Sequence, residues 1–123
     1  MSQISDFYEI KSIDISEEGI KGVVSLNETH PIFSAHFPGN PITPGVLLLR
    51  IVTELLEKSI DKRMQLNTAV NIKFKKPIHP SIEPTFMIRK MKEIGNQISV
   101  NISIEAEDIQ YVKMSLLYDL KSE

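Results

Sequence analysis

A histidine in a rigid loop, followed by an apolar run, is the feature of this sequence best suited to chemistry. Residues 30–50 read HPIFSAHFPGNPITPGVLLLR and hold four prolines, two glycines and two histidines. The imidazole of His36 can accept and release a proton near neutral pH, as a general base must. The prolines stiffen the loop, which matters because a displacement of about 1 Å can cost about a hundredfold in rate. We therefore expect a proton-transfer site in this stretch.

The start of the next segment offers a second chemical group. Residues 43–60, TPGVLLLRIVTELLEKSI, are predicted to form a helix that Thr43 caps and in which Pro44 occupies the first turn. Gly45 lies just inside that helix, so its backbone N–H is accessible at the positive end of the helix dipole. A carbonyl oxygen that gains negative charge during a reaction would be stabilised at this position.

The pattern of the helix places charge on one side and apolar residues on the rest. At 100° per residue, one polar arc is shared by Arg50, Thr53, Glu54, Glu57, Lys58 and Asp61. The remaining surface is apolar and is formed by Val46, Leu47, Leu48, Leu49, Ile51, Val52, Leu55 and Leu56. So wide an apolar surface predicts a helix that is covered on most sides by other elements.

The rest of the chain reads as strands. Two are predicted before the helix, over residues 6–16 and 19–26, and an irregular stretch follows over 27–44. Four are predicted after it, over 68–76, 85–93, 97–107 and 111–120, with a tight turn at Gly95-Asn96. The economical packing is an α+β fold in which a curved antiparallel sheet of about six strands wraps around one long central helix.

Composition sets broad limits on the function. The 123 residues suffice for one domain, so we expect residues 1–123 to form a single unit. The chain has no cysteine, which excludes disulfides, thiol catalysis and cysteine-ligated zinc and agrees with a cytoplasmic location. No stretch is long and apolar enough to span a membrane, and the net charge of −2 does not favour nucleic acid as a partner. We expect neither a metal nor a cofactor.

Positive charge gathers in one segment. Residues 70–92 hold six lysines and arginines against one acid, Glu83. Such a patch can attract an acidic protein or a phosphate-bearing ligand, although solubilising lysines on exposed strands would give the same pattern.

Two segments of the sequence resemble a known family. HFPGNPITPGVLLL matches the His-Phe-Pro-Gly-x-Pro-x-x-Pro-Gly-Val-Leu signature of the FabZ-like and FabA-like 3-hydroxyacyl-acyl carrier protein dehydratases at every fixed position. FKKPIHP, at residues 74–80, resembles the family's Phe-x-x-Pro-x-x-Pro segment. The resemblance implies a hotdog fold, a dimer whose two sheets join, and acyl thioesters of acyl carrier protein or coenzyme A as substrates. It also implies removal of water to give a trans-2-enoyl product in fatty acid or related lipid or polyene biosynthesis.

The resemblance assigns roles to individual residues. His36 becomes the catalytic base, and Gly45 becomes part of the site that binds the thioester carbonyl. Phe37 and Val46 belong to the same signature, and we expect them to contact the substrate. In the family, the site lies at the dimer interface, and an acidic residue comes from the helix of the other protomer.

One position departs from the family in a way that affects the chemistry. The family's acid, Glu or Asp, stands fourteen positions after the histidine, where this chain has Arg50. A guanidinium stays protonated and cannot give a proton to a leaving hydroxide at neutral pH. Arg50 could simply pair with Glu54 on the polar arc, or it could bind an acidic or phosphate group of the substrate. Glu54, one turn later, is the candidate replacement acid.

Several functions therefore stay open. The first is a dehydratase in which either Glu54 or a second, related hotdog subunit supplies the acid, so that the chain works as a homodimer or a mixed dimer. The second is a catalytically impaired subunit that binds acyl thioesters or acts as a scaffold. A thioesterase uses the same fold, but hotdog thioesterases generally rely on a carboxylate as well.

Overall fold

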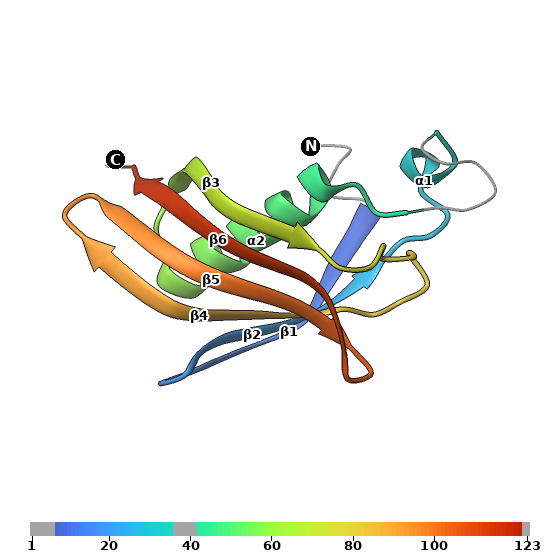
Figure 1. Ribbon diagram of the computed structural model, residues 1–123, viewed down its shortest axis with the longest axis horizontal. Helices are drawn as coiled ribbons and strands as arrows, with labels where there is room; N and C mark the ends of the chain where they lie inside the picture. The colour runs from blue at the N-terminus through green and yellow to red at the C-terminus, as the bar shows by residue number, and fades with distance from the viewer. Residues whose placement is uncertain (1–6, 36–41, 122–123) are drawn as a thin grey trace.

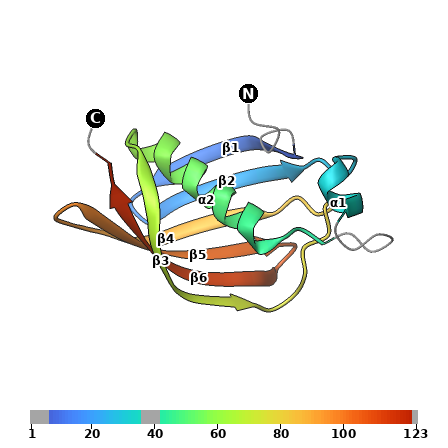
Figure 2. The ribbon, with the colours of Figure 1, turned by 90° about the horizontal axis from the view of Figure 1, so that it is seen from above.

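The chain folds as predicted into a six-stranded antiparallel sheet around a long helix. The computed structural model describes residues 7–35 and 42–121. Its elements are β1 (Tyr8–Ser16), β2 (Gly19–Leu26), α1 (Pro31–Ala35), α2 (Gly45–Ile60), β3 (Met64–Phe74), β4 (Thr85–Ile94), β5 (Gln97–Ala106) and β6 (Ile109–Leu120). The strand order is β1-β2-β4-β5-β6-β3, so β1 and β3 form the edges. Figures 1 and 2 show α2 lying against one face of the curved sheet.

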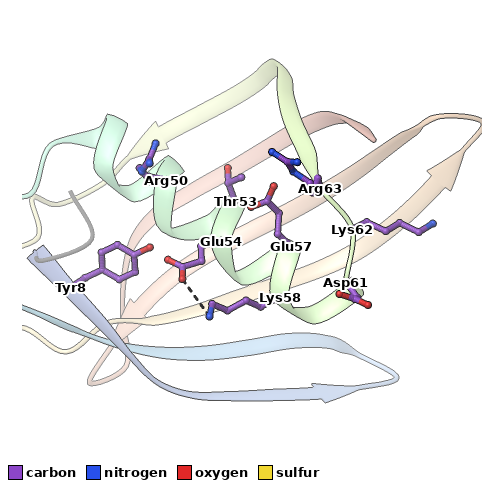
Figure 3. A pocket seen from close by; sticks show the side chains of 9 residues that line it. All are labelled: Tyr8, Arg50, Thr53, Glu54, Glu57, Lys58, Asp61, Lys62 and Arg63. Atoms are coloured by element: carbon purple, nitrogen blue, oxygen red, sulfur yellow. Dashed lines mark ion pairs between the residues drawn. The ribbon is translucent and has the colours of Figure 1, made fainter. Parts of the chain in front are cut away.

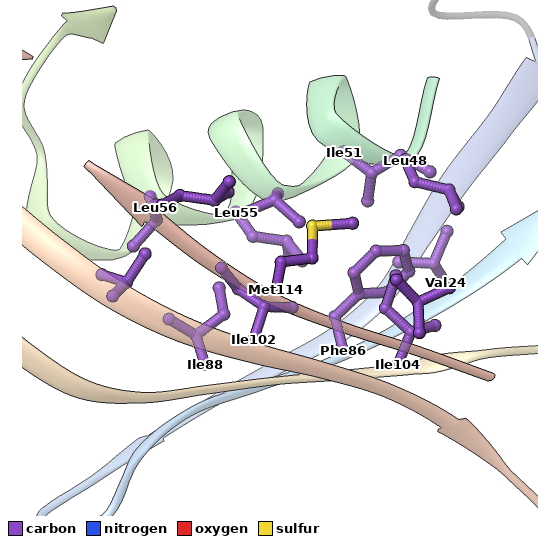
Figure 4. Close-up of a cluster of buried hydrophobic side chains, with 14 of the residues drawn as sticks. Val24, Leu48, Ile51, Leu55, Leu56, Phe86, Ile88, Ile102, Ile104 and Met114 are labelled. Carbon is purple, nitrogen blue, oxygen red and sulfur yellow. The ribbon is translucent and has the colours of Figure 1, made fainter. Parts of the chain in front are cut away.

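The apolar side of α2 explains why the sheet wraps around it. Leu48, Ile51, Leu55 and Leu56 lie between the helix and the sheet in Figure 4, and none is more than 1% exposed. The strands contribute the other half of this core, including Val24, Phe86, Ile88, Ile102, Ile104 and Met114. Burial of one side chain of this size contributes about 1.5–3 kcal/mol. The position of α2 on the sheet is therefore strongly determined.

The length and the charge of α2 decide whether this helix could cross a membrane. The helix has 16 residues, and its outer side carries charged groups. A helix that crosses a bilayer needs about 20 mostly apolar residues. In the described part of the chain, no helix is long and apolar enough to cross a membrane.

The first turn of α2 differs from the prediction in two ways. The helix begins at Gly45, and its N-cap is Pro44, which makes no side-chain hydrogen bond. The prediction that Thr43 caps the helix is wrong, because the backbone is extended at Pro44 (ψ 145°) and Thr43 lies one residue before the cap. Val46 was expected to be covered but is 71% exposed, since the neighbouring Leu47 and Leu48 occupy the buried side of that turn.

Two-residue turns join the later strands. The predicted hairpin at Gly95-Asn96 is confirmed: Ile94 pairs with Gln97, and Gly95 has φ 59°, which glycine adopts without strain. A second tight turn, Glu107-Asp108, has φ 50° and 65°, as a type I′ turn requires. This turn was not predicted, so β6 begins at Ile109, earlier than expected.

Side chains fix the edge strand β3 to its neighbours. The backbone N–H of Met64 donates to the carboxylate of Glu57 on α2, at 3.1 Å. Asp119 of β6 accepts hydrogen bonds from Gln97 of β5 and Asn67 of β3, and these bonds lower the pKa of Asp119. Because pairing with β6 extends back to Met64, β3 begins there and not at residue 68 as predicted.

The stretch predicted to be irregular contains the short helix α1. Its start is stabilised by His30, whose Nδ1 accepts a hydrogen bond from the N–H of Ile32 at 3.0 Å. The N–H of Phe33 donates to the carbonyl of His30, and Phe33 is almost fully buried. His30 therefore has a structural role at the start of α1.

A polar contact within the core links α2 to β6. The phenol oxygen of the fully buried Tyr118 lies 2.9 Å from Oγ1 of Thr53, which also donates to the carbonyl of Leu49 at 3.0 Å. Burial raises the pKa of Tyr118, and the nearby Glu57 adds to this effect, whereas the bond to Thr53 opposes it. The phenol thus stays neutral and hydrogen-bonded beneath the helix.

We expect the two partners in this contact to be unequally sensitive to mutation. Thr53→Val leaves the buried phenol of Tyr118 without a partner and should cost about 1–3 kcal/mol of unfolding free energy. Tyr118→Phe leaves Thr53 bonded to Leu49 and should cost only about 0.5–1.5 kcal/mol. Urea denaturation of both variants and of the double variant checks the order, and equal losses would contradict it.

Candidate functional site

A cavity of about 530 Å³ lies where the start of α2 meets the end of β3. One wall consists of residues 42–45 and Leu48, and the other consists of residues 74–78 and Val112. The N–H of Thr43 donates to the carbonyl of Ile78 at 2.9 Å and holds the two walls together. The two segments singled out by resemblance, which are distant in sequence, therefore build one cavity.

The helix start at this cavity has unused hydrogen-bond donors. The carbonyl of Pro44 accepts from the N–H groups of Leu47 and Leu48, at 3.1 and 3.3 Å. The N–H groups of Gly45 and Val46 have no acceptor among the described residues. Pro44 cannot cap with its side chain, and the first turn contains no acidic residue. The partial positive charge of about half an elementary unit at the helix start is therefore available to water or to a ligand.

Gly45 is required for the shape of the cavity. A Cβ atom at this position would lie 2.8 Å from Cζ of Phe74, which is too close for two carbon atoms. The ring of Phe74 thus packs directly on the helix backbone, although the side chain is 58% exposed. Buried Leu48, Ile78 and Val112 make the rest of the lining apolar. The cavity suits a ligand with an apolar chain and one polar group at the helix start.

Lysines stand at the same cavity. Lys75 and Lys76 both line it, and their backbone N–H groups both donate to the carbonyl of Tyr111. The ammonium group of Lys75 donates to the side chain of Gln110. The predicted basic segment thus contributes two positive charges to the lining of an apolar cavity.

A second, polar groove of about 800 Å³ runs along the outer side of α2 (Figure 3). Its lining is the predicted polar arc of the helix together with Tyr8, Lys62 and Arg63. Glu54 pairs with Lys58 at 3.6 Å, and not with Arg50 as one interpretation expected. Arg50 has no ion-pair partner within the described ranges. Arg50 and Glu54 therefore share one groove, and they do not line the cavity that contains Gly45.

The predicted site residues are placed as follows. Gly45 lines the cavity. Val46 is exposed on the first turn of α2 and lines neither the cavity nor the polar groove. His36 and Phe37 lie outside the described residues, so their positions stay predictions. The sequence did not indicate Thr43 as a lining residue, because the cap preference of threonine suggested a different role.

Two further observations concern titratable groups. Nδ1 of His79 lies 2.8 Å from Oγ of Ser81 and accepts the N–H of Ser81 at 3.1 Å, so this histidine orders a turn. Among residues 7–35 and 42–121, no three His, Asp or Glu side chains gather as metal ligands would.

The curated relatives that match this chain are dehydratases by name. The chain is 34% identical to the 3-hydroxyacyl-[acyl-carrier-protein] dehydratase FabZ of Brucella abortus over 91 residues, which cover 68% of this chain and 56% of the relative. It is 36% identical to FabZ of Rhizobium johnstonii over 85 residues, which cover 63% and 53%. The chain thus spans little more than half the length of these curated relatives.

Solved structures support the same fold. The dehydratase heterocomplex ApeI:P from Xenorhabdus doucetiae superposes with a TM-score of 0.73 at 16% identity, covering 90% of this chain and 96% of that one. A hypothetical thioesterase with coenzyme A from Streptococcus pneumoniae gives 0.64 at 12% identity, covering 94% and 90%. The fold is the hotdog fold. The family model of the ApeI-like dehydratases, described as ApeI dehydratase, matches residues 12–114, and this chain therefore belongs to that family.

Proposed function

We propose that this chain is one subunit of a 3-hydroxyacyl-thioester dehydratase and that a second hotdog chain supplies the missing acid. The observation that carries the proposal is the uncapped start of α2 at an apolar cavity built from both signature segments. Membership of a dehydratase family supports it. The acyl chain would occupy the cavity, with its thioester carbonyl at the N–H of Gly45.

The proposed chemistry combines this position of the acyl chain with the role that the family signature assigns to His36, which lies outside the described residues. His36 removes a proton from C2 of the acyl chain, and the electron pair of that bond forms the C2–C3 double bond. The C3–O bond breaks at the same time, and an acid protonates the leaving hydroxide to give water. The Gly45 N–H and the helix dipole stabilise negative charge on the thioester oxygen as the C2 proton leaves.

This chain is poorly equipped to provide the acid. Arg50 occupies the position where the family has a carboxylate, and its guanidinium cannot transfer a proton. Glu54 lies nine residues beyond Gly45, about 13 Å along the helix axis, and is paired with Lys58. Both facts favour an acid from a second chain, as does the two-protein complex formed by the ApeI:P dehydratase.

The edge strand β3 is the proposed contact with that second chain. Residues 67–71 of β3 are exposed and uncharged, whereas the other edge, β1, carries Glu9, Lys11 and Asp14. Charges protect an open edge against pairing, so β3 is the edge left free to pair. Val46, Val70 and Phe74 add exposed apolar surface on and beside it. Phe74 belongs to β3 and also lines the cavity. A partner that pairs along β3 would therefore lie next to the cavity.

We further propose that the substrate arrives on acyl carrier protein or as a coenzyme A thioester. The FabZ relatives act on carrier-protein substrates according to their names. Lys73 lies near the end of β3, and Lys75 and Lys76 follow the strand and line the cavity. These lysines can attract an acidic protein or a phosphate group.

Arg50 also favours a second function, that of an acyl-binding subunit without turnover. Such a chain would keep the cavity and the β3 edge but would not complete a proton-transfer site. The experiment below distinguishes this function from the dehydratase.

The principal prediction concerns a mixed dimer. This chain, co-purified with a hotdog chain of the same genome that has Glu or Asp at the position of Arg50, should dehydrate a 3-hydroxyacyl thioester, measured by enoyl absorbance. His36→Ala in this chain should lower that rate by about a hundredfold or more, because a general base contributes about 10²–10⁴. Turnover that is absent with every such partner would leave the acyl-binding function in its place.

Variants of the lone chain identify the acid. Arg50→Glu should give the homodimer measurable activity, whereas Arg50→Gln, which removes the charge without adding a carboxylate, should not. If the unmodified homodimer is already active and Glu54→Gln abolishes that activity, Glu54 is the acid and the mixed dimer is unnecessary.

The lysines should affect carrier-protein substrates selectively. Charge reversal of Lys73 and Lys76 should weaken binding of acyl carrier protein by about tenfold at low salt, as Coulomb terms of about 1 kcal/mol predict. Binding of the same acyl chain on pantetheine should be unchanged. Lys21→Glu, an exposed lysine on β2, is the control. Equal effects on both ligands in calorimetry would contradict carrier-protein docking at this surface.

The contact of Gly45 with Phe74 should determine the cavity shape. Gly45→Ala should displace the ring of Phe74. Because that ring is half-exposed and can move, the loss of unfolding free energy should be smaller than the usual cost of overpacking, about 1–3 kcal/mol. Binding of a 3-hydroxyacyl pantetheine should fall about tenfold. Phe74→Leu added to Gly45→Ala should restore part of that affinity, and strictly additive effects would show that the two sites do not interact.

A further inference from the structure

Thr43 carries a polar group that the fold itself does not use. The residue is 4% exposed and, apart from two tyrosines, it is the only buried residue with a polar side chain in the described ranges. Its Oγ1 is closed off from solvent and has no hydrogen-bond partner there. Its backbone N–H is already bonded to Ile78. The hydroxyl is the one polar group of the threonine side chain, and it has no hydrogen-bond partner among the described residues.

An unpaired buried hydroxyl lowers stability, because the group gives up its hydrogen bonds to water and gains none. Valine has nearly the same shape and would avoid that loss. Buried polar atoms without partners are rare in native proteins, and each needs an explanation. Thr43 lines the cavity beside the uncapped start of α2, which points to a bound ligand as the missing partner.

We propose that Thr43 is a specificity-determining residue whose hydroxyl hydrogen-bonds the 3-hydroxyl of an acyl chain bound in this cavity. The inference rests on the proposed function and deepens it by naming the group that selects the substrate. The hydroxyacyl substrate gains this bond, and the enoyl product and a saturated acyl chain cannot make it. Recognition of this kind favours entry of substrate and release of product.

The positions of the groups fit this role. Thr43 and Gly45 are two residues apart, a span of about 7 Å at most between their Cα atoms. The hydroxyl-bearing carbon of the ligand lies two bonds from the thioester carbonyl carbon, so a ligand anchored at Gly45 brings its hydroxyl toward Thr43. In the structure Oγ1 is closed off from solvent and so does not face the open cavity. The bond to the ligand therefore requires rotation about χ1, which exchanges Oγ1 with the methyl group between staggered positions.

No other lining residue in the described part of the chain offers a hydroxyl. The other side chains are aliphatic or aromatic, apart from Lys75 and Lys76. Lys75 is engaged by Gln110, and an ammonium group would prefer an anion to a neutral hydroxyl. Thr43 is therefore the side chain suited to a neutral donor and acceptor on the ligand.

The test compares two ligands on the full-length chain. Calorimetry gives the affinity of a 3-hydroxyacyl pantetheine and of the saturated acyl pantetheine of the same length. The unmodified chain should prefer the hydroxyacyl ligand by about threefold to tenfold, which corresponds to one neutral hydrogen bond. Thr43→Val should abolish this preference by weakening only the hydroxyacyl ligand, and Thr43→Ser should retain it.

Melting temperature provides the second measurement. Thr43→Val should melt a few degrees higher than the unmodified chain, because it removes an unpaired buried hydroxyl, so a loss of preference would not reflect misfolding. The control is Ser59→Ala, which removes the other buried hydroxyl without a partner, on α2 and away from the cavity lining. This control should leave the preference unchanged.

The outcomes separate the two proposals. If neither pantetheine ligand binds, the proposed function fails. If both bind but Thr43→Val keeps the preference, or Ser59→Ala loses it equally, the acyl site stands and the role of Thr43 is overturned. If Thr43→Val weakens both ligands by the same factor, Thr43 shapes the cavity without reading the 3-hydroxyl, and the inference is overturned as well.

Discussion

The uncapped start of α2 is the feature on which the rest of the site depends. Most helices begin with a side chain that satisfies the first N–H groups, and removing such a cap costs about 1 kcal/mol. Here Pro44 stands at the cap position and Thr43 does not reach the helix. Among the described residues, the N–H groups of Gly45 and Val46 therefore have no acceptor at this end of the apolar cavity. These donors are available to water or to a ligand, and the proposed function uses them for a ligand.

The uncapped first turn lowers the stability of α2, and the packing of its later turns compensates for that loss. Leu48, Ile51, Leu55 and Leu56 are buried against the sheet, and Thr53 adds a hydrogen bond to Tyr118. With the later turns held in this way, the first turn can keep unsatisfied groups without fraying. The hydrogen bond from Thr43 to Ile78 and the contact of Phe74 with Gly45 then fix the cavity walls on either side. The buried part of α2 and its uncapped start are thus two ends of one element.

Patterns of local origin allowed most of the fold to be predicted from sequence. The 3.6-residue periodicity around Ile51 and Leu55 and the alternation from Ile98 to Ile104 reflect burial that any packing of these elements requires. One error was local, because the extended backbone at Pro44 cancels the cap that Thr43 would otherwise provide. Another arose where contacts distant in sequence decide, since the start of β3 depends on pairing with β6. The site followed the same rule: Gly45 could be predicted from its motif, but its contact with Phe74 could not.

The carboxylates of α2 lie away from the apolar cavity, which supports the proposal that a second chain supplies the acid. Arg50 and Glu54 face the polar groove, whereas the apolar cavity lies at the helix start and the end of β3. A carboxylate that acts as an acid must lie within hydrogen-bond reach of the leaving hydroxyl, and Glu54 is engaged by Lys58 instead. The open, uncharged edge of β3 adjoins the cavity through Phe74, so a chain that pairs there brings its own side chains to the acyl group. Loss of the acid in one subunit is then compatible with catalysis, because each site of a mixed dimer needs only one base and one acid, drawn from different chains.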